Sequence, residues 1–203
     1  MNSSLDQYKR KISKEEINAL PLRRYEGKIH LVRTHDELEN AMDVLRQSKV
    51  LGFDTETRPT FRKGRVNLPS LVQLACPQAV YLIQLSWLPL DGHLADLLSD
   101  PSIIKTGVAV RDDIRDLRKL YDFKDGGVVD LGEEAKIFQL ETHGLRNLAA
   151  NFLSFRISKN AQCTNWANLE LGPQQVAYAA TDAWVSREIH LRMDELGLVR
   201  HSS

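Results

Sequence analysis

VLGFDTET, residues 50–57, is the stretch of sequence on which the fold assignment depends. Its apolar and β-branched residues predict a strand, and strand side chains alternate between the two faces of a sheet. Asp54 and Glu56 therefore project to one side, and Leu51 and Phe53 to the other. Acidic residues are depleted in strands. Two carboxylates on one face thus indicate either a cation bound between them or a strand end at which both are solvated.

Strands and helices alternate on both sides of this stretch. Apolar residues with a period of two predict strands, and apolar residues at helical spacing predict amphipathic helices. The expected strands cover residues 28–34, 50–57, 71–75, 80–85, 103–110 and 128–131, and the expected helices cover residues 35–48, 91–99, 111–120, 144–153 and 173–196. Three strands close together, followed by alternating helices and strands, predict an α/β fold with a mixed sheet flanked by helices.

Composition and charge restrict the class of protein. The 203 residues carry 27 Lys and Arg against 27 Asp and Glu, and 42% are hydrophobic, which excludes an intrinsically disordered chain. Zero net charge excludes a globally basic nucleic-acid binder, so any polyanion must be held by a local basic patch or through metal ions. No internal segment has the composition of a linker. We therefore expect one domain over residues 25–203, preceded by a polar, partly helical arm over residues 1–24.

Sequence features also indicate the cellular compartment. No stretch approaches the roughly 20 apolar residues of a membrane helix, and the N-terminal residues lack the apolar core of a secretory signal. Cys76 and Cys163 form neither a CxxC pair nor a zinc-binding spacing. We therefore expect a cytoplasmic protein without a membrane partner, in which both thiols are reduced and packed.

A second unusual acid lies in the last expected helix. Tyr178 and Asp182 are four residues apart and share a face, which continues as the apolar stripe Val185, Ile189 and Met193. Asp182 therefore lies at the head of the face that meets the core, where an unpaired carboxylate is costly. It needs a basic partner or a metal, and a Tyr–Asp pair favoured by the helix dipole is an equally acceptable interpretation.

Asp113 repeats this arrangement, at the head of Leu117 and Leu120 in the helix expected over residues 111–120. An acid in a first helical turn is by itself ordinary capping chemistry. Four carboxylates at the ends of core-facing elements are more specific. All-oxygen ligands suit Mg²⁺ or Mn²⁺ rather than zinc. Several carboxylates shared by two cations about 3.5–4 Å apart are the arrangement used for in-line phosphoryl transfer.

Three motifs resemble those of a known family. FDTET (53–57), KTGVAVRDD (105–113) and YAATDA (178–183) are similar to the three exonuclease motifs of the DEDD 3′–5′ exonucleases. A tyrosine four residues before the last aspartate is typical of the tyrosine branch, which includes ribonuclease D and the Werner-helicase exonuclease domain. PSLVQLA, VVDL, GLRNLA and CTNW also match, so the resemblance spans about residues 25–197. It implies a ribonuclease H-like fold.

The resemblance also implies a reaction and the residues that perform it. The reaction is hydrolysis of single-stranded or 3′-ended DNA or RNA from the 3′ end, releasing nucleoside 5′-monophosphates with two divalent cations, Mg²⁺ or Mn²⁺. The implied metal ligands are Asp54, Glu56, Asp113 and Asp182. Glu56 and Tyr178 are the implied catalytic residues, with Tyr178 positioning the attacking water. Asp113 is chosen over Asp112 because of its spacing after Gly107 and its place on the apolar helix face.

Candidate substrate contacts flank the acids. Residues 58–65, RPTFRKGR, begin two residues after the second acid and contain no acid of their own. Their candidate phosphate contacts are Arg62, Lys63 and Arg65. Such a loop is either a phosphate-gripping lip or simply solvated, and its adjacency to the acids favours the lip. Thr55 is a further candidate, as is Trp166, which either stacks on a base, for about 1–3 kcal/mol, or packs within its own domain.

A function from another class remains as the alternative: a nuclease fold that binds RNA or a protein partner without catalysis. Zero net charge and the lack of a broad basic face favour this alternative. The presence of all five motif residues speaks against it.

Overall fold

The computed structural model describes residues 3–60 and 67–200 and has a six-stranded sheet at its centre. The strand order is β1-β4-β3-β2-β5-β6. The strands are β1 (Lys28–Val32), β2 (Val50–Thr57), β3 (Pro69–Ala75), β4 (Ala79–Gln84), β5 (Ile104–Gly107) and β6 (Val128–Asp130). Strands β2, β3 and β4 pair antiparallel, whereas the β1–β4, β2–β5 and β5–β6 pairs are parallel. The sheet is therefore mixed, as the sequence predicts.

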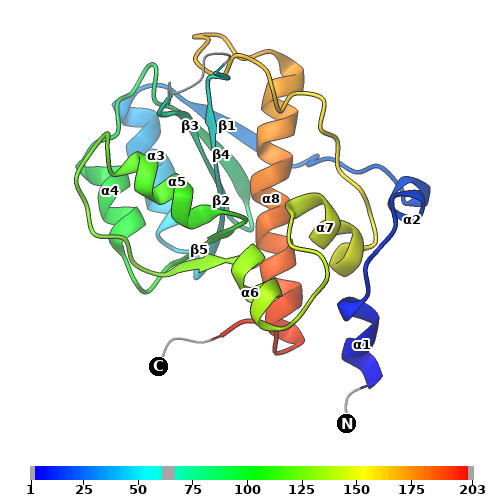
Figure 1. The fold of residues 1–203 in the computed structure, drawn as a ribbon. Coiled ribbons are helices and arrows are strands. Elements are labelled where there is room, and N and C mark those ends of the chain that lie inside the picture. The colour runs from blue at the N-terminus through cyan, green and yellow to red at the C-terminus, as the bar shows by residue number, and fades with distance from the viewer. Residues whose placement is uncertain (1–2, 61–66, 201–203) are drawn as a thin grey trace.

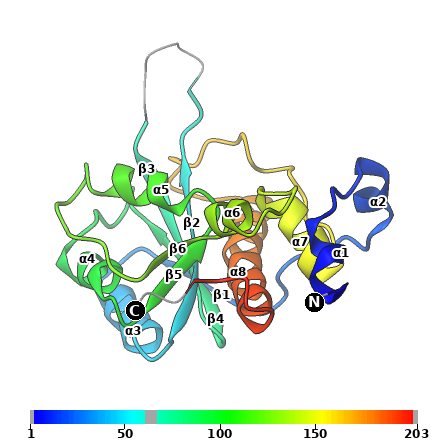
Figure 2. The same cartoon turned by 60° about the horizontal axis from the view of Figure 1, so that its bottom comes forward.

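Helices cover both faces of the sheet (Figures 1 and 2). They are α1 (Ser3–Lys9), α2 (Lys14–Ala19), α3 (His35–Leu45), α4 (Gly92–Ser99), α5 (Val110–Leu117), α6 (Leu131–Ile137), α7 (Leu145–Leu153) and α8 (Pro173–Glu195). On one face, Leu51 and Phe53 of β2 lie in one core cluster with α3, α4 and α5. On the other face, Leu71 and Ala75 of β3 pack against the alanines of α8. The alternation of β2 side chains thus assigns its acids to the α8 face.

Gly52 lets α8 lie directly on β2. A Cβ atom built at this position would come within 1.9 Å of the Ala183 carbonyl oxygen and 2.9 Å of the Arg187 backbone nitrogen. On the helix side, Ala179, Ala180 and Ala183 are fully buried, and their small side chains allow the backbone of α8 to approach β2 closely. This close approach brings Asp182 of α8 to the two acids of β2.

We expect Gly52→Ala to lower the free energy of unfolding by about 2 kcal/mol or more, because the methyl group must push backbone apart rather than a flexible side chain. Chemical denaturation measures this loss. The control is Gly92→Ala, whose added Cβ would meet its nearest atom, the Tyr121 hydroxyl, at 3.6 Å. Equal stability of the two variants would contradict the close approach at Gly52.

The N-terminal arm packs on the domain. Tyr8 of α1 stacks on Phe152 of α7 with ring centroids 4.8 Å apart, and the Asn151 side-chain amide donates to the Tyr8 carbonyl oxygen at 2.8 Å. The chain from α2 to β1 then crosses α8, where the Tyr25 N–H donates to Thr181 Oγ1 (Figure 1). The arm thereby contributes buried surface as well as helices.

The structure corrects several details of the sequence analysis. Helix α6 was not predicted. Strand β5 ends at Gly107 because Ala109 adopts a left-handed conformation (φ 62°) that turns the chain into α5. Leu120 lies beyond the end of α5 and is 41% exposed, so it does not extend that helix's apolar face. Cys76 is buried as expected, but Cys163 is exposed and is not a packing residue. Among residues 3–60 and 67–200, no helix is long and apolar enough to cross a membrane.

Candidate active site

Three of the four predicted ligands come together where β2 meets α8. Asp54, Glu56 and Asp182 each offer one carboxylate oxygen, and these oxygens lie within 4.8 Å of one another. Asp182 is 5% exposed, and the two β2 acids are partly buried. Such crowding of like charges is stable only if the acids are protonated or share a cation. The donor set is entirely oxygen, which fits Mg²⁺ or Mn²⁺.

Asp113 approaches from the opposite face of the sheet. The Thr55 side chain, which points away from Asp54 and Glu56, donates its hydroxyl to Asp113 Oδ1 at 2.6 Å. Asp113 is therefore fixed beside the three-acid cluster and is not one of its members. It still lies near enough for its charge to raise the pKa of Asp54. The substrate contact predicted for Thr55 stays a prediction, and in this structure the hydroxyl serves Asp113.

The pKa values of all four acids are raised. Burial is the largest cause for Asp54, followed by the charges of Asp182, Asp113 and Glu56. Burial, followed by the charges of Asp182 and Asp113, raises the pKa of Glu56 to about 9. Burial raises the pKa of Asp113 and that of Asp182 to about 7, although Thr55 and Tyr178 oppose this by donating hydrogen bonds. The cluster thus resists carrying its full negative charge without a cation.

No lysine or arginine among the described residues neutralises the cluster. The nearby arginines of α5 are used elsewhere: Arg111 pairs with Glu133 of α6 at 3.0 Å, and Arg115 pairs with Asp112 at 2.6 Å. A structural ion-pair network would instead place these side chains on the clustered acids. The arrangement therefore fits a bound metal better than a salt bridge.

Tyr178 lies one helical turn before Asp182 and donates its hydroxyl to that carboxylate. Burial, followed by the charge of Asp182, raises the tyrosine pKa above its ordinary value. The hydroxyl accordingly keeps its proton at neutral pH. It can orient a partner by hydrogen bonding, and it cannot serve as a strong base.

The pKa shifts predict how stability depends on pH when no metal is present. The folded-state pKa values exceed the ordinary values of 3.8 for Asp and 4.5 for Glu, so between about pH 4 and 9 the folded protein binds more protons than the unfolded chain. In EDTA, the Tm should therefore fall as the pH rises from 5 to 9, by about 5 °C or more. Millimolar Mn²⁺ at pH 8 should restore it.

Thermal melts of the wild type and Asp182→Asn, with and without EDTA, test this dependence. Histidine titration is common to both proteins, so the difference between them isolates the acids. A wild-type Tm in EDTA that rises with pH would show that the carboxylates are paired with cationic side chains.

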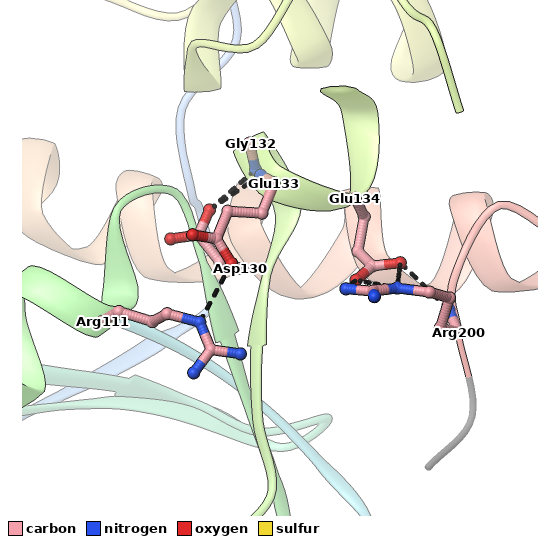
Figure 3. A network of polar contacts seen from close by, with 6 residues as sticks. All are labelled: Arg111, Asp130, Gly132, Glu133, Glu134 and Arg200. Atoms are coloured by element: carbon pink, nitrogen blue, oxygen red, sulfur yellow. Dashed lines mark hydrogen bonds and ion pairs between the residues drawn. The ribbon is translucent and has the colours of Figure 1, made fainter. Parts of the chain in front are cut away.

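A polar network supports the α5 side of the centre (Figure 3). Asp130, at the end of β6, caps α6 by accepting from the backbone N–H groups of Gly132 and Glu133 at 2.9 and 3.2 Å. Its charge also contributes to the raised pKa of Asp113. The Arg111–Glu133 pair then ties the start of α5 to α6. Helix α6, which the sequence analysis missed, thus braces the helix that carries Asp113.

The predicted substrate contacts have different outcomes. Arg62, Lys63 and Arg65 lie outside the described residues, and the phosphate-gripping lip stays a prediction. Trp166 is 1% exposed and packs against Tyr178 with ring centroids 5.9 Å apart. This burial supports the interpretation in which Trp166 packs within its own domain, and a stacking contact with a base stays a prediction. Its visible role is to support the catalytic candidate Tyr178.

Comparison with known proteins assigns the family. The sequence matches the family described as 3′–5′ exonuclease over residues 29–197. It is 31% identical over 159 residues to the Mus musculus bifunctional 3′–5′ exonuclease/ATP-dependent helicase WRN, covering 75% of this chain and 11% of that protein. It is 29% identical over 206 residues to the Homo sapiens exonuclease mut-7 homolog, covering 87% of this chain and 23% of that protein. The chain thus spans a quarter or less of the length of these relatives.

Solved structures agree with this assignment. The Aedes aegypti Nibbler EXO domain superposes with a TM-score of 0.75 at 27% identity, covering 87% of this chain and 92% of that one. Escherichia coli RNase D has a TM-score of 0.74 at 20% identity, covering 84% of this chain and 46% of that one, and supports the fold alone. The ribonuclease H-like fold implied by the sequence motifs is confirmed. By its sequence match over nearly the whole sheet and α8, the chain belongs to the 3′–5′ exonuclease family.

Proposed function

We propose that this chain is a catalytically competent 3′–5′ exonuclease that uses two divalent cations, Mg²⁺ or Mn²⁺, and releases nucleoside 5′-monophosphates. The observation that carries the proposal is the cluster of Asp54, Glu56 and Asp182, whose oxygens lie within 4.8 Å of one another without a cationic side chain among the described residues. An inactive relative would have no reason to retain a self-repelling cluster beside a hydrogen-bonded tyrosine.

Each residue has a defined task in this proposal. Asp54, Glu56 and Asp182 would hold one cation, and Asp113, which Thr55 fixes beside the cluster, would join Asp54 in holding the other. When bound, the cations acidify water and neutralise the charge that develops on the phosphate. Tyr178, fixed by its hydrogen bond to Asp182, orients the attacking water in line with the terminal phosphodiester. Thr55 holds the Asp113 carboxylate at the edge of β2 through its 2.6 Å hydrogen bond.

Single-stranded or 3′-ended nucleic acid is the proposed substrate, with DNA and RNA both retained. A Trypanosoma brucei RNase D of the same fold has been solved in complex with RNA U12 (TM-score 0.69, 23% identity). Among the curated relatives, one combines a 3′–5′ exonuclease with a helicase. Discrimination between DNA and RNA depends on contacts to the 2′-hydroxyl.

Hydrolysis of 5′-labelled single strands tests the proposal directly. DNA and RNA of one sequence are incubated with Mn²⁺, with Mg²⁺ and with EDTA. We expect a ladder shortened from the 3′ end, released mononucleotides, and complete inhibition by EDTA. If the protein binds strands but hydrolyses none under any metal condition, the proposal is wrong. The alternative, a non-catalytic binding module, which the zero net charge favours, then holds instead.

A further inference from the structure

A groove of about 900 Å³ lies beside the acid cluster, within the size range of ligand sites. One wall is the segment over residues 20–27, here called the strap, and the other is the loop over residues 158–161. The first half of α8 forms the floor. Tyr178 and Asp182 are among the lining residues, so the groove reaches the candidate catalytic centre.

The strap is held firmly although it lies outside the family match over residues 29–197. The Arg23 backbone N–H donates to the Arg156 carbonyl oxygen at 2.9 Å, and the Arg156 N–H donates back to the Pro21 carbonyl oxygen at 2.9 Å. The Tyr25 N–H donates to Thr181 Oγ1 at 3.0 Å, one residue before Asp182. The strap, which precedes the residues matched by the family, therefore forms one wall of the groove against α8.

The groove's chemistry is that of a polyanion site. Arg23 and Arg24 of the strap are exposed, and neither pairs with a carboxylate within residues 3–60 and 67–200. Asn160 and Gln174 offer uncharged hydrogen-bonding groups along the same groove. Unpaired guanidinium groups complement phosphate, which arginine binds with two parallel hydrogen bonds. The strap also carries Glu26, so its two arginines outnumber its one acid, and part of the groove lining is apolar. A chain of phosphates leading toward the acids is the ligand that fits.

We propose that the groove between the strap and α8 binds the backbone of the single nucleic-acid strand that enters the catalytic centre, with Arg23 and Arg24 each contacting a phosphate. This proposal rests on the proposed function, because the strand is the substrate. It places a binding determinant in residues that precede the family core.

Binding of a fluorescent 12-nucleotide strand, measured in EDTA from 50 to 300 mM salt, tests this proposal. Each phosphate contact contributes about −0.7 to the slope of log K against log salt for single strands, so Arg23→Ala/Arg24→Ala should lower the slope's magnitude by about 1.4 and weaken binding about 25-fold at 0.1 M salt. DNA and RNA strands should lose affinity equally, because the contacts are to phosphates. The matched control is Arg46→Ala/Lys49→Ala, which removes two exposed cations from the end of α3 and the loop after it.

Two further readouts separate the groove from the catalytic centre. Hydrolysis of the p-nitrophenyl ester of thymidine 5′-monophosphate should be unchanged in the strap variant, because this small ester does not extend along the groove. If the strap variant loses no more strand affinity than the Arg46→Ala/Lys49→Ala control, the proposal that the groove binds the strand is overturned, whatever the hydrolytic activity. Absence of hydrolysis in the wild type would instead overturn the proposed function while leaving the binding comparison valid.

An independent observation concerns Gln73 of β3. Its side chain is completely buried, yet neither Nε2 nor Oε1 has a hydrogen-bond partner among residues 3–60 and 67–200. Leaving an amide unsatisfied in the interior is costly, and such groups are rare in native proteins. Gln73 is the antiparallel partner of Asp54. Directly opposite residues share a face with Cβ atoms about 4.5–5.5 Å apart, so the unsatisfied amide lies beside the acid cluster.

The geometry assigns Gln73 as a positioning residue for Asp54: its amide orients that carboxylate when the acids hold a cation. The partners of a ligating carboxylate typically change metal affinity about 10–100-fold. An amide that is unsatisfied in the metal-free fold and satisfied only in the loaded one strengthens cation binding without stabilising the apo protein.

Gln73→Leu tests this role, with Gln84→Leu as the matched control. Gln84 is equally buried, but it accepts from Arg33 Nε and donates to the Asn168 and Leu169 carbonyl oxygens. We expect Gln73→Leu to keep or raise the Tm in EDTA and to weaken Mn²⁺ binding about tenfold by calorimetry. Gln84→Leu should lower the Tm and leave Mn²⁺ affinity unchanged. A Gln73→Leu variant that is destabilised or unfolded in EDTA, or that binds Mn²⁺ as tightly as the wild type, would overturn the assignment.

Discussion

Asp54→Asn is expected to reduce turnover by about 10³-fold or more, because a bound cation supplies several kcal/mol of charge stabilisation and each 1.36 kcal/mol changes the rate tenfold. The pKa of Asp54 is raised by burial and by the charges of all three other acids, so its charge is costly in the cluster without a cation. The same substitution should therefore leave the protein as stable as the wild type in EDTA, or more stable. Single-turnover hydrolysis and thermal melts measure the two effects.

Asp112→Asn is the control for this substitution. Asp112 is adjacent to Asp113 in sequence, but it is exposed and pairs with Arg115. Removing its charge should change turnover less than about threefold, since exposed ion pairs contribute only about 0–1 kcal/mol. A severe loss in Asp112→Asn would mean that the second motif's ligand had been assigned to the wrong aspartate. A large loss of stability in Asp54→Asn would mark Asp54 as part of a structural network.

Tyr178→Phe should lower turnover by about 10²–10⁴, the usual contribution of a positioned proton-handling group. The substitution removes only the hydroxyl, so the packing of the ring against Trp166 is retained. The carboxylates stay in place, and Mn²⁺ affinity and strand binding should consequently be close to those of the wild type. Single-turnover rates with the small ester and with a strand measure the loss of chemistry separately from binding.

Tyr121→Phe is the matched control, because Tyr121 is 42% exposed and lies outside the cluster. It should keep full activity. Full turnover in Tyr178→Phe would show that Tyr178 is a packing residue and would remove the water-orienting step. Loss of Mn²⁺ binding in Tyr178→Phe would show that the hydroxyl acts through Asp182 rather than on the water.

The faces on which the acids lie could be predicted from sequence, but the distances between them could not. A period of two places Asp54 and Glu56 together, and a period of 3.6 places Tyr178 above Asp182 on the buried side of α8. How closely these pairs approach depends on the contact of Gly52 with Ala183, which joins residues far apart in sequence. No local pattern reports such a contact.

Other differences between prediction and structure also have identifiable structural causes. Asp113 is predicted on the correct helix, yet its hydrogen bond to Thr55 places it on the opposite side of β2. Helix α6 has only seven residues and includes a glycine, so it shows too little apolar periodicity to be detected. Trp166 is in a loop, as predicted, but a loop can still fold back on the core and bury its aromatic ring.

The contact of α8 with β2 also determines when, during synthesis, the candidate active site can form. Helix α8 is the last helix among the described residues, and it carries Tyr178 and Asp182. During synthesis the sheet strands emerge first, and Leu71, Ala75 and Leu82 stay uncovered until α8 docks on them. A chain that stops before Pro173 lacks both functional side chains and exposes that apolar face, which favours aggregation. Any metal-dependent cleavage by this centre therefore begins only after the whole domain has been made and folded, so nascent chains are harmless to the nucleic acid around them.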